Sequence, residues 1–411
     1  MSKHDLGRTL RTAFVRANWA FVELKKGIND VWASFTFTRS FVFVSALVFI
    51  LPVISLYKSK YTRLDKLSSY YYGVDLDLVA EKRGTTNGVI SSTRQNAVIV
   101  ALVRNSELDK MRDSIKQFER RFNAKFNYPY LFFNDEPFTD SFKEDIKSVT
   151  PSKLDFITLE KEFWEIPKNI NTTLFTEKLA ENKDRYIYGD NVSYRLMCRF
   201  ESMLFYNHPS MATYEFYWRI EPDVDYYCNV NYDPFSFMKT NNYTYGFNIA
   251  LVEIQETVPT LWSETKAWVR QNQHYLPEAN IASWLLDDNG DYNMCHFWSN
   301  FEIVNLNFYR SEAYTSYVKF LDSAHGFFYE RWGDAPIHSL AVSILLPKEN
   351  IFYFEDIGYR HSTVSVCPSN SEMARNCACK GRTSFHRSVC FNNWRDSKNI
   401  SKRKFLDSIS S

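Results

Sequence analysis

The chain has 411 residues, of which 45% are hydrophobic and 24% charged, so it is long and apolar enough for a sizeable core in one large domain or two. Its 49 basic and 48 acidic residues leave a net charge of +1, which argues against a nucleic-acid partner, since duplex binding needs clustered positive charge. The many aromatic residues suit a cleft for sugar rings or bases, although filling the core is their default role.

The first apolar element is an uncharged stretch of 18 residues, 40–57, bounded by Arg39 and Lys58. It shows no polar face and is just long enough to span a thin bilayer. A long N-terminal segment precedes it and no small-residue cleavage site follows, so we expect a transmembrane signal-anchor rather than a cleaved signal peptide. The expected organisation is a cytoplasmic tail (1–39), the anchor (40–57), a polar lumenal stem (58–94) and a catalytic domain (95–411).

The charges flanking the anchor do not decide its orientation, because both sides carry basic clusters. Two other features lie entirely C-terminal to it: four Asn-X-Ser/Thr sequons and all seven cysteines. Both favour a lumenal body. Four of the cysteines crowd between residues 367 and 390 without a convincing histidine partner, so disulfides in an oxidising compartment are preferred over zinc, with no pairing assigned.

The body begins with a βαβ unit. Residues 96–103 form a continuous apolar run typical of a strand buried on both faces, 107–122 show helical spacing with Ser106 as a possible cap, and 128–133 form a second short strand. This order predicts a parallel sheet, with Arg104, Asn105 and Ser106 in the crevice where ligands bind. No glycine-rich loop follows the first strand, which excludes a dinucleotide or P-loop site.

Further elements follow in order: a helix over 194–206, a strand ending at Glu221, a strand over 245–254 and a helix over 260–275. Glu221, Asp223 and Asp225 occupy alternate positions after an aromatic run. If the chain stays extended, the three carboxylates face one side, where a divalent cation with oxygen ligands would relieve their repulsion. The plain alternative is a solvated turn, because acids and proline are ordinary turn residues.

Three later clusters place polar groups among aromatic residues. Glu302 lies in an apolar stretch and is equally compatible with a paired core acid and with a site residue. His338 is expected on a helix after Pro336 in a structural role. His361 by itself more often has a surface or core role than a ligand role.

Taken together, these segments resemble the fungal Golgi α-1,2-mannosyltransferase family, type II membrane enzymes that elongate O- and N-linked mannose chains. The resemblance covers about residues 95–390 and implies a GT-A-type α/β fold, a mixed sheet flanked by helices, with GDP-mannose as donor and Mn²⁺ as cofactor. It is carried by these segments: 102–107, 194–200, 217–225, 298–302, 326–336 and 356–361.

The resemblance also implies roles for individual residues. Glu221 and His361 would hold the metal, and Tyr194 would contact the acceptor. The family's proposed nucleophile falls on Glu302, although front-face attack guided by the departing phosphate is equally compatible with retention of the anomeric configuration. The other residues expected to bind the donor fall into three groups. Arg104 and Arg331 could contact phosphate or guanine, Asn105 and Ser106 lie in the crevice, and Asp223 and Asp225 belong to the acidic segment.

The implied function is transfer of mannose to mannose-terminated O- or N-linked glycans of glycoproteins by a single-pass Golgi membrane protein with a lumenal catalytic domain. Two alternatives remain on the same scaffold. One is a mannosylphosphate transferase or an accessory subunit of one, and the other is an inactive glycan-binding protein.

Overall fold

The computed structural model describes residues 94–287, 289–379 and 388–409. The predicted tail, anchor and most of the stem lie outside these residues. Within the described part of the chain, no helix has both the length and the apolar character needed to cross a membrane.

A mixed seven-stranded sheet forms the centre of the fold, in the order β11-β6-β10-β4-β1-β2-β3. Strands β4, β1, β2 and β3 run parallel, whereas β10 runs antiparallel to both of its neighbours, β4 and β6. The strands are β1 (Ala97–Leu102), β2 (Tyr130–Asn134), β3 (Leu154–Thr158), β4 (Phe216–Arg219), β6 (Tyr245–Phe247), β10 (Ile303–Asn305) and β11 (Ile351–Tyr353).

The predicted βαβ unit is confirmed. The first strand, β1, is buried along almost its whole length, and it pairs in parallel with β2. Between them lie α4 (Leu108–Phe118), a π-helical turn and α5 (Ala124–Phe126), which ends where Asn127 adopts a left-handed φ of 56°. Ser106 does not cap this helix: a 3₁₀ turn (Asn105–Glu107) precedes α4, and the Glu107 carboxylate accepts from the backbone N–H of Arg104.

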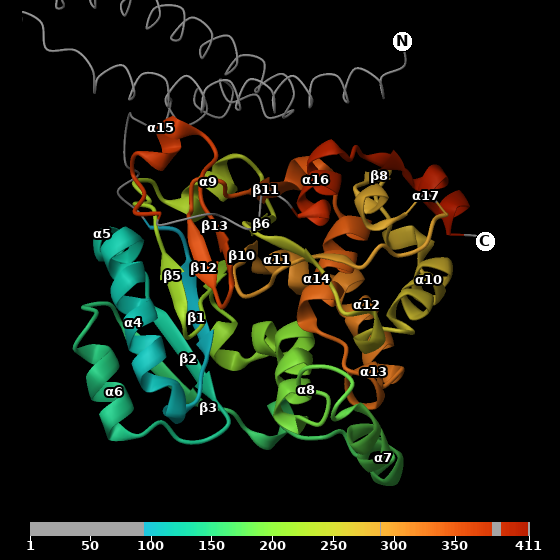
Figure 1. Cartoon of the computed structure of the whole chain (residues 1–411), viewed down its shortest axis with the longest axis horizontal. Coiled ribbons are helices and arrows are strands. Elements are labelled where there is room, and N and C mark those ends of the chain that lie inside the picture. Colours follow the sequence, from blue (N-terminus) through green and yellow to red (C-terminus); the bar gives the residue numbers. More distant parts are fainter. Residues whose placement is uncertain (1–93, 288, 380–387, 410–411) are drawn as a thin grey trace, which may run out of the picture. The chain divides into compact units, whose positions relative to one another are not determined.

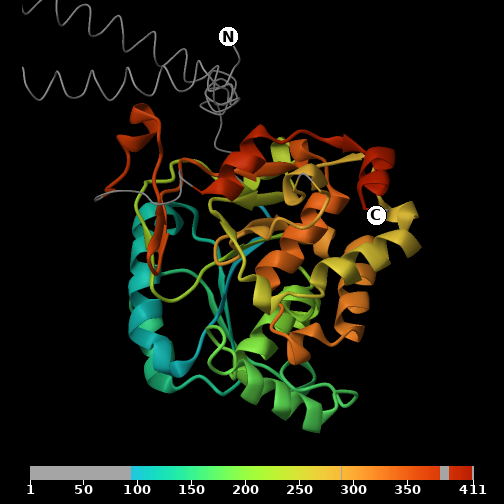
Figure 2. The ribbon, with the colours of Figure 1, turned by 45° about the vertical axis from the view of Figure 1, so that its right-hand side comes forward.

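Helices cover both faces of the sheet (Figures 1 and 2). On one face, Phe118 of α4 packs its ring 4.8 Å from that of Trp218 in β4. On the other face, Phe205 packs 4.9 Å from Tyr217, the next residue of the same strand. This alternation places Tyr217 and Arg219 together on the second face. The helices of that face are α8 (Val192–Arg199), α11 (Leu306–Tyr309), α12 (Glu312–Ser323) and α14 (Asp334–Leu345).

Two other predicted elements have mixed outcomes. The helix expected over 260–275 is confirmed as α10 (Leu261–Gln271). The single strand expected over 245–254 is wrong, because the chain leaves the main sheet after β6. It then forms β7 (Ala250–Val252), which pairs with β9 (Cys295–Phe297) in a separate two-stranded sheet. A continuous apolar pattern cannot distinguish one strand from two that join different sheets.

A small three-stranded sheet adjoins the main one and is built from β5 (Val224–Tyr226), β12 (Tyr359–His361) and β13 (Val364–Val366). Disulfides stabilise this region, joining Cys228 to Cys377 and Cys367 to Cys379. A third disulfide joins Cys295 to Cys390, and Cys198 is a buried free thiol. The preference for disulfides over zinc is therefore confirmed. The remaining helices are α6 (Asp140–Lys147), α7 (Thr172–Asn182), α9 (Pro234–Thr240), α13 (Gly326–Tyr329), α15 (Ser371–Ala374), α16 (Val389–Asp396) and α17 (Lys402–Ser408), with the short strands β8 (Ala279–Asn280) and β14 (Ile400–Ser401).

Candidate active site

The candidate site lies at the carboxyl edge of the parallel strands. Val100 of β1 pairs with Arg219 of β4, so the segments following the two strands meet at one edge of the sheet. Ligands bind preferentially at this edge in α/β proteins.

Arg219 is the centre of a buried charge cluster at this edge, with only 7% of its side chain exposed. Its guanidinium lies 2.5 Å from the Glu221 carboxylate, 2.6 Å from that of Asp334 and 3.8 Å from that of Glu201. Burial alone would lower the pKa of Arg219, but the surrounding carboxylates outweigh it and raise the pKa. Arg219 therefore stays charged and fixes the Glu221 side chain through the Oε1 atom.

The two predicted metal ligands lie side by side. Glu221 Oε2 lies 3.8 Å from His361 Nε2, and the two side chains are 22% and 24% exposed. Ligand atoms each about 2.1 Å from one cation are at most about 4.2 Å apart, so this separation suits a shared ion. The other ring nitrogen of His361, Nδ1, lies 2.9 Å from the amide nitrogen of Asn300, and this contact orients the ring. This oxygen and nitrogen pair fits a cation such as Mn²⁺.

The prediction that three carboxylates face one side is wrong. The chain does not stay extended, because Asp223 adopts a left-handed φ of 61° between β4 and β5. Asp225 instead points to Arg360 of β12, whose Nε lies 2.5 Å away, and it also accepts from the Gln117 amide. Asp223 is exposed and lies 3.5 Å from the same guanidinium. Of the three acids, only Glu221 is close to His361 among the ion pairs of the described residues.

The crevice residues after β1 differ in what they offer a ligand. Arg104 is exposed, and its guanidinium lies 2.5 Å from the Ser193 hydroxyl at the start of α8. Ser106 is exposed as well. The Asn105 side-chain amide donates to the Pro137 carbonyl and accepts from the Thr139 N–H, both in the loop after β2. Asn105 therefore positions that loop.

Arg331 and Tyr194 form a second part of the site. The buried Arg331 guanidinium lies over the Tyr194 ring at 5.1 Å from its centroid and 3.6 Å from the Glu253 carboxylate. Its Nε atom has no hydrogen-bond partner among the described residues. Burial raises the pKa of Tyr194 well above its ordinary value, so its hydroxyl keeps its proton at neutral pH.

Glu302 lies beneath this edge and is fully buried. Its carboxylate accepts from the hydroxyls of Tyr217 and Tyr245, and it lies 3.1 Å from Nδ1 of His338 in α14. Burial alone would lower the pKa of His338, but the charge of Glu302 and the hydrogen bond to it raise that pKa. His338 therefore has the structural setting expected from the sequence, and Glu302 has a full set of partners.

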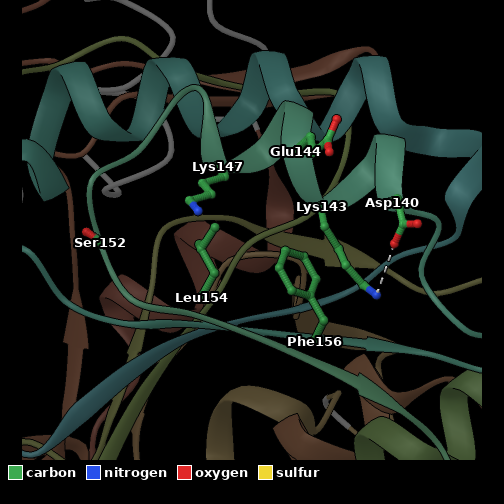
Figure 3. A pocket seen from close by; sticks show the side chains of 7 residues that line it. All are labelled: Asp140, Lys143, Glu144, Lys147, Ser152, Leu154 and Phe156. Atoms are coloured by element: carbon green, nitrogen blue, oxygen red, sulfur yellow. Dashed lines mark ion pairs between the residues drawn. The ribbon is translucent and has the colours of Figure 1, made fainter.

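A surface hollow of about 480 Å³ lies elsewhere, between α6 and the edge strand β3 (Figure 3). Leu154 and Phe156 of β3 line it below Lys143 and Lys147 of α6. None of the predicted site residues contributes to its lining.

Sequence reasoning missed Arg219, Asp334 and Ser299 as site residues. The Asp334 carboxylate, at the start of α14, accepts from the Ser299 hydroxyl at 2.7 Å as well as from Arg219. For Arg219 a signal existed, because it lies two residues before Glu221 and so shares its strand face. Ser299 and Asp334 lie within two of the segments that carry the family resemblance, but no local pattern links them to Arg219, because tertiary packing brings them together.

The fold and the edge site define an α/β glycosyltransferase. Over matched regions, the structure superimposes on the mannosyltransferase Ktr4p of Saccharomyces cerevisiae in complex with GDP, with a TM-score of 0.73 and 36% identity, covering 78% of this chain and 86% of that one. It also matches core-mannan synthase A (CmsA/Ktr4) of Aspergillus fumigatus in its Mn/GDP form, with a TM-score of 0.69 and 40% identity, covering 78% of this chain and 87% of that one.

Residues 76–399 match the family model described as glycolipid 2-alpha-mannosyltransferase, and the chain belongs to this family. It is 48% identical over 289 residues to the glycolipid 2-alpha-mannosyltransferase of S. cerevisiae, a match that covers 70% of this chain. The matched part spans 65% of that relative's own length. The O-glycoside alpha-1,2-mannosyltransferase omh1 of Schizosaccharomyces pombe is 40% identical, with 74% of this chain and 78% of the relative covered.

Proposed function

We propose that this chain is a retaining α-1,2-mannosyltransferase of GT-A type that uses GDP-mannose as donor and Mn²⁺ as cofactor. The acceptors are mannose-terminated O- or N-linked glycans of glycoproteins. The observation that carries the proposal is the Glu221 and His361 pair, 3.8 Å apart at the carboxyl edge of the sheet. Family membership and the GDP and Mn named for two similar structures support it.

Glu221 Oε2 and His361 Nε2 would hold the cation, which when bound neutralises the departing diphosphate as a Lewis acid. Arg219 holds the other oxygen of Glu221, and this leaves Oε2 directed toward His361. Ligation needs the lone pair of Nε2, so the ring proton would lie on Nδ1. The Asn300 atom 2.9 Å from Nδ1 is the amide nitrogen, so ligation would require the Asn300 side chain to turn and present its oxygen to Nδ1.

Tyr194 and Glu302 act on the sugars in different ways. A tyrosine hydroxyl is protonated at neutral pH, and burial raises the pKa of Tyr194 further, so this hydroxyl can donate a hydrogen bond to a substrate oxygen. Glu302 is fully buried and saturated with hydrogen bonds, which favours an electrostatic role and front-face attack over a covalent intermediate.

The proposed location is the Golgi lumen, with residues 40–57 as a type II anchor. Three disulfides among the described residues support an oxidising compartment.

The test uses the detergent-solubilised full chain with GDP-mannose, Mn²⁺ and a panel of α-mannosides, with product linkage determined by NMR. Glu221→Ala and His361→Ala are expected to lower turnover by at least about a hundred-fold. His274→Ala, at an exposed histidine away from the site, is the matched control and leaves turnover unchanged.

Survival of turnover and Mn²⁺ dependence in both variants would refute the metal assignment. Release of GMP with a phosphate-bearing product would instead indicate mannosylphosphate transfer. Absence of turnover on every acceptor, with binding to mannan, would indicate a glycan-binding protein.

A further inference from the structure

The connection between α7 and α8 exposes two large apolar side chains beside the candidate site. In residues 186–191, here called the tyrosine loop, Ile187 is 59% exposed and Tyr188 is 46% exposed. Loops that expose large apolar groups gain little from burial, so their conformation is normally free to vary. The tyrosine loop instead is tightly fixed.

Arg195 of α8 holds the tyrosine loop from below. Its side chain is fully buried, and its guanidinium donates to the backbone carbonyls of Tyr188, Gly189 and Asn191 at 2.8–3.2 Å. A fourth bond, from Nε to the Glu330 carbonyl, ties the loop to the segment that carries Arg331. A buried guanidinium is costly, so this arrangement is an unusual way to order a surface loop.

The backbone of the loop is equally constrained. Tyr188 has a left-handed φ of 61°, a conformation that is unfavourable for a residue with a side chain. Gly189 approaches so closely that an added Cβ would lie 1.8 Å from the Asn182 carbonyl oxygen. Strain of this kind concentrates where function requires a particular geometry.

The constraint presents the Tyr188 ring to the site. Its ring stacks on that of Tyr194, with centroids 4.4 Å apart and planes 19° apart. Tyr194 in turn receives the Arg331 guanidinium, which also lies over Tyr186 at 5.5 Å. Aromatic contacts therefore connect Tyr194, the predicted acceptor-contacting residue, to the partly exposed Tyr188 ring.

We infer that Tyr188 forms a subsite for the second sugar ring of the acceptor, the ring before the mannose that receives the new residue. The inference rests on the proposed function, which places the receiving mannose at Tyr194. Pyranose rings present an apolar C–H face that packs on aromatic rings, and a partly exposed tyrosine offers both that face and a hydroxyl. With this subsite, the tyrosine loop distinguishes an acceptor of at least two sugar rings from a single mannose.

The experiment compares methyl α-mannoside with α-1,2-mannobioside as acceptors for the full chain. Tyr188→Ala is expected to raise KM for the disaccharide about ten-fold and to leave kcat/KM for the monosaccharide within about two-fold. Tyr188→Phe keeps the ring and should retain disaccharide preference. Tyr188→Asn lacks the ring but tolerates the left-handed backbone, so it should fold well and still lose the preference. Val389→Ala, at an apolar residue 55% exposed on α16, is the matched control.

Equal effects of Tyr188→Ala on both acceptors, or none on either, would overturn the inference. Weakened binding of GDP alone by Tyr188→Ala would also overturn it, because the ring would then serve the donor base. If the wild-type chain transfers no mannose, the proposed function fails, and the subsite is then tested by binding of α-1,2-mannobiose in NMR titrations. Binding by the wild type that Tyr188→Ala weakens supports the subsite, and no binding by the wild type refutes it.

Discussion

Replacing Arg219 by methionine tests whether the buried charge cluster organises the site. The substitution keeps much of the side-chain length but removes the guanidinium, which lies within 4 Å of Glu201, Glu221 and Asp334. The carboxylate of Asp334 is almost fully buried, so it would be left in the interior with the Ser299 hydroxyl as its remaining partner in this cluster.

Removing one partner of a buried ion pair costs about 3–5 kcal/mol, because the other charge is left uncompensated. The loss depends on pH. Burial alone would raise the pKa of Asp334, but Arg219 and His338 outweigh it and hold the pKa below its ordinary value of 3.8. The ionised form thus contributes stability above the unfolded pKa, and this contribution is lost as pH falls through the lower folded pKa. The difference between wild type and variant is therefore expected to be largest near neutral pH and to shrink in acid.

The assay is urea unfolding of the full chain in detergent, followed by tryptophan fluorescence at neutral and acid pH. Arg112→Met is the matched control, because Arg112 also lies within 4 Å of three carboxylates, those of Asp109, Asp113 and Asp145. Its side chain is 27% exposed against 7% for Arg219, so its loss should be much smaller. Equal losses in the two variants, or a loss for Arg219→Met that does not change with pH, would refute the reasoning.

Two further predictions concern stability. Burial raises the pKa of Glu201 from 4.5 to about 7, so the free energy of unfolding falls as pH rises between those values. In thermal unfolding, Glu201→Gln should remove this dependence on pH and be more stable than the wild type at pH 8. An unchanged slope would mean that the carboxylate does not titrate there. The double variant Cys295→Ser/Cys390→Ser, which opens a disulfide with a sequence separation of 95, should lose about 2–5 kcal/mol in urea unfolding, whereas Cys198→Ser serves as the control without a disulfide. Equal stability of the two cysteine variants would contradict a structural role for the bridge.

Local patterns determined much of the framework from the sequence alone. The apolar run at 96–103 and the helical spacing after it correctly predict β1 and α4. A strand buried on both faces gives a continuous apolar run, and a helix buried on one face gives apolar residues at helical spacing. The aromatic run before Glu221 is also a local pattern, and it predicts the strand β4. The cysteine pattern indicated disulfides, while their pairing needed the fold.

Only the tertiary structure decided how the site is assembled. It brought His361 of β12 to Glu221, and Asp334 of α14 to Arg219, through contacts between segments far apart in the chain. It also turned Asp225 toward Arg360, because a single left-handed residue at Asp223 breaks the strand alternation that the sequence suggests. Periodicity describes how neighbouring residues share a face, and it carries no information on which distant segment packs against that face or where one backbone angle changes its direction.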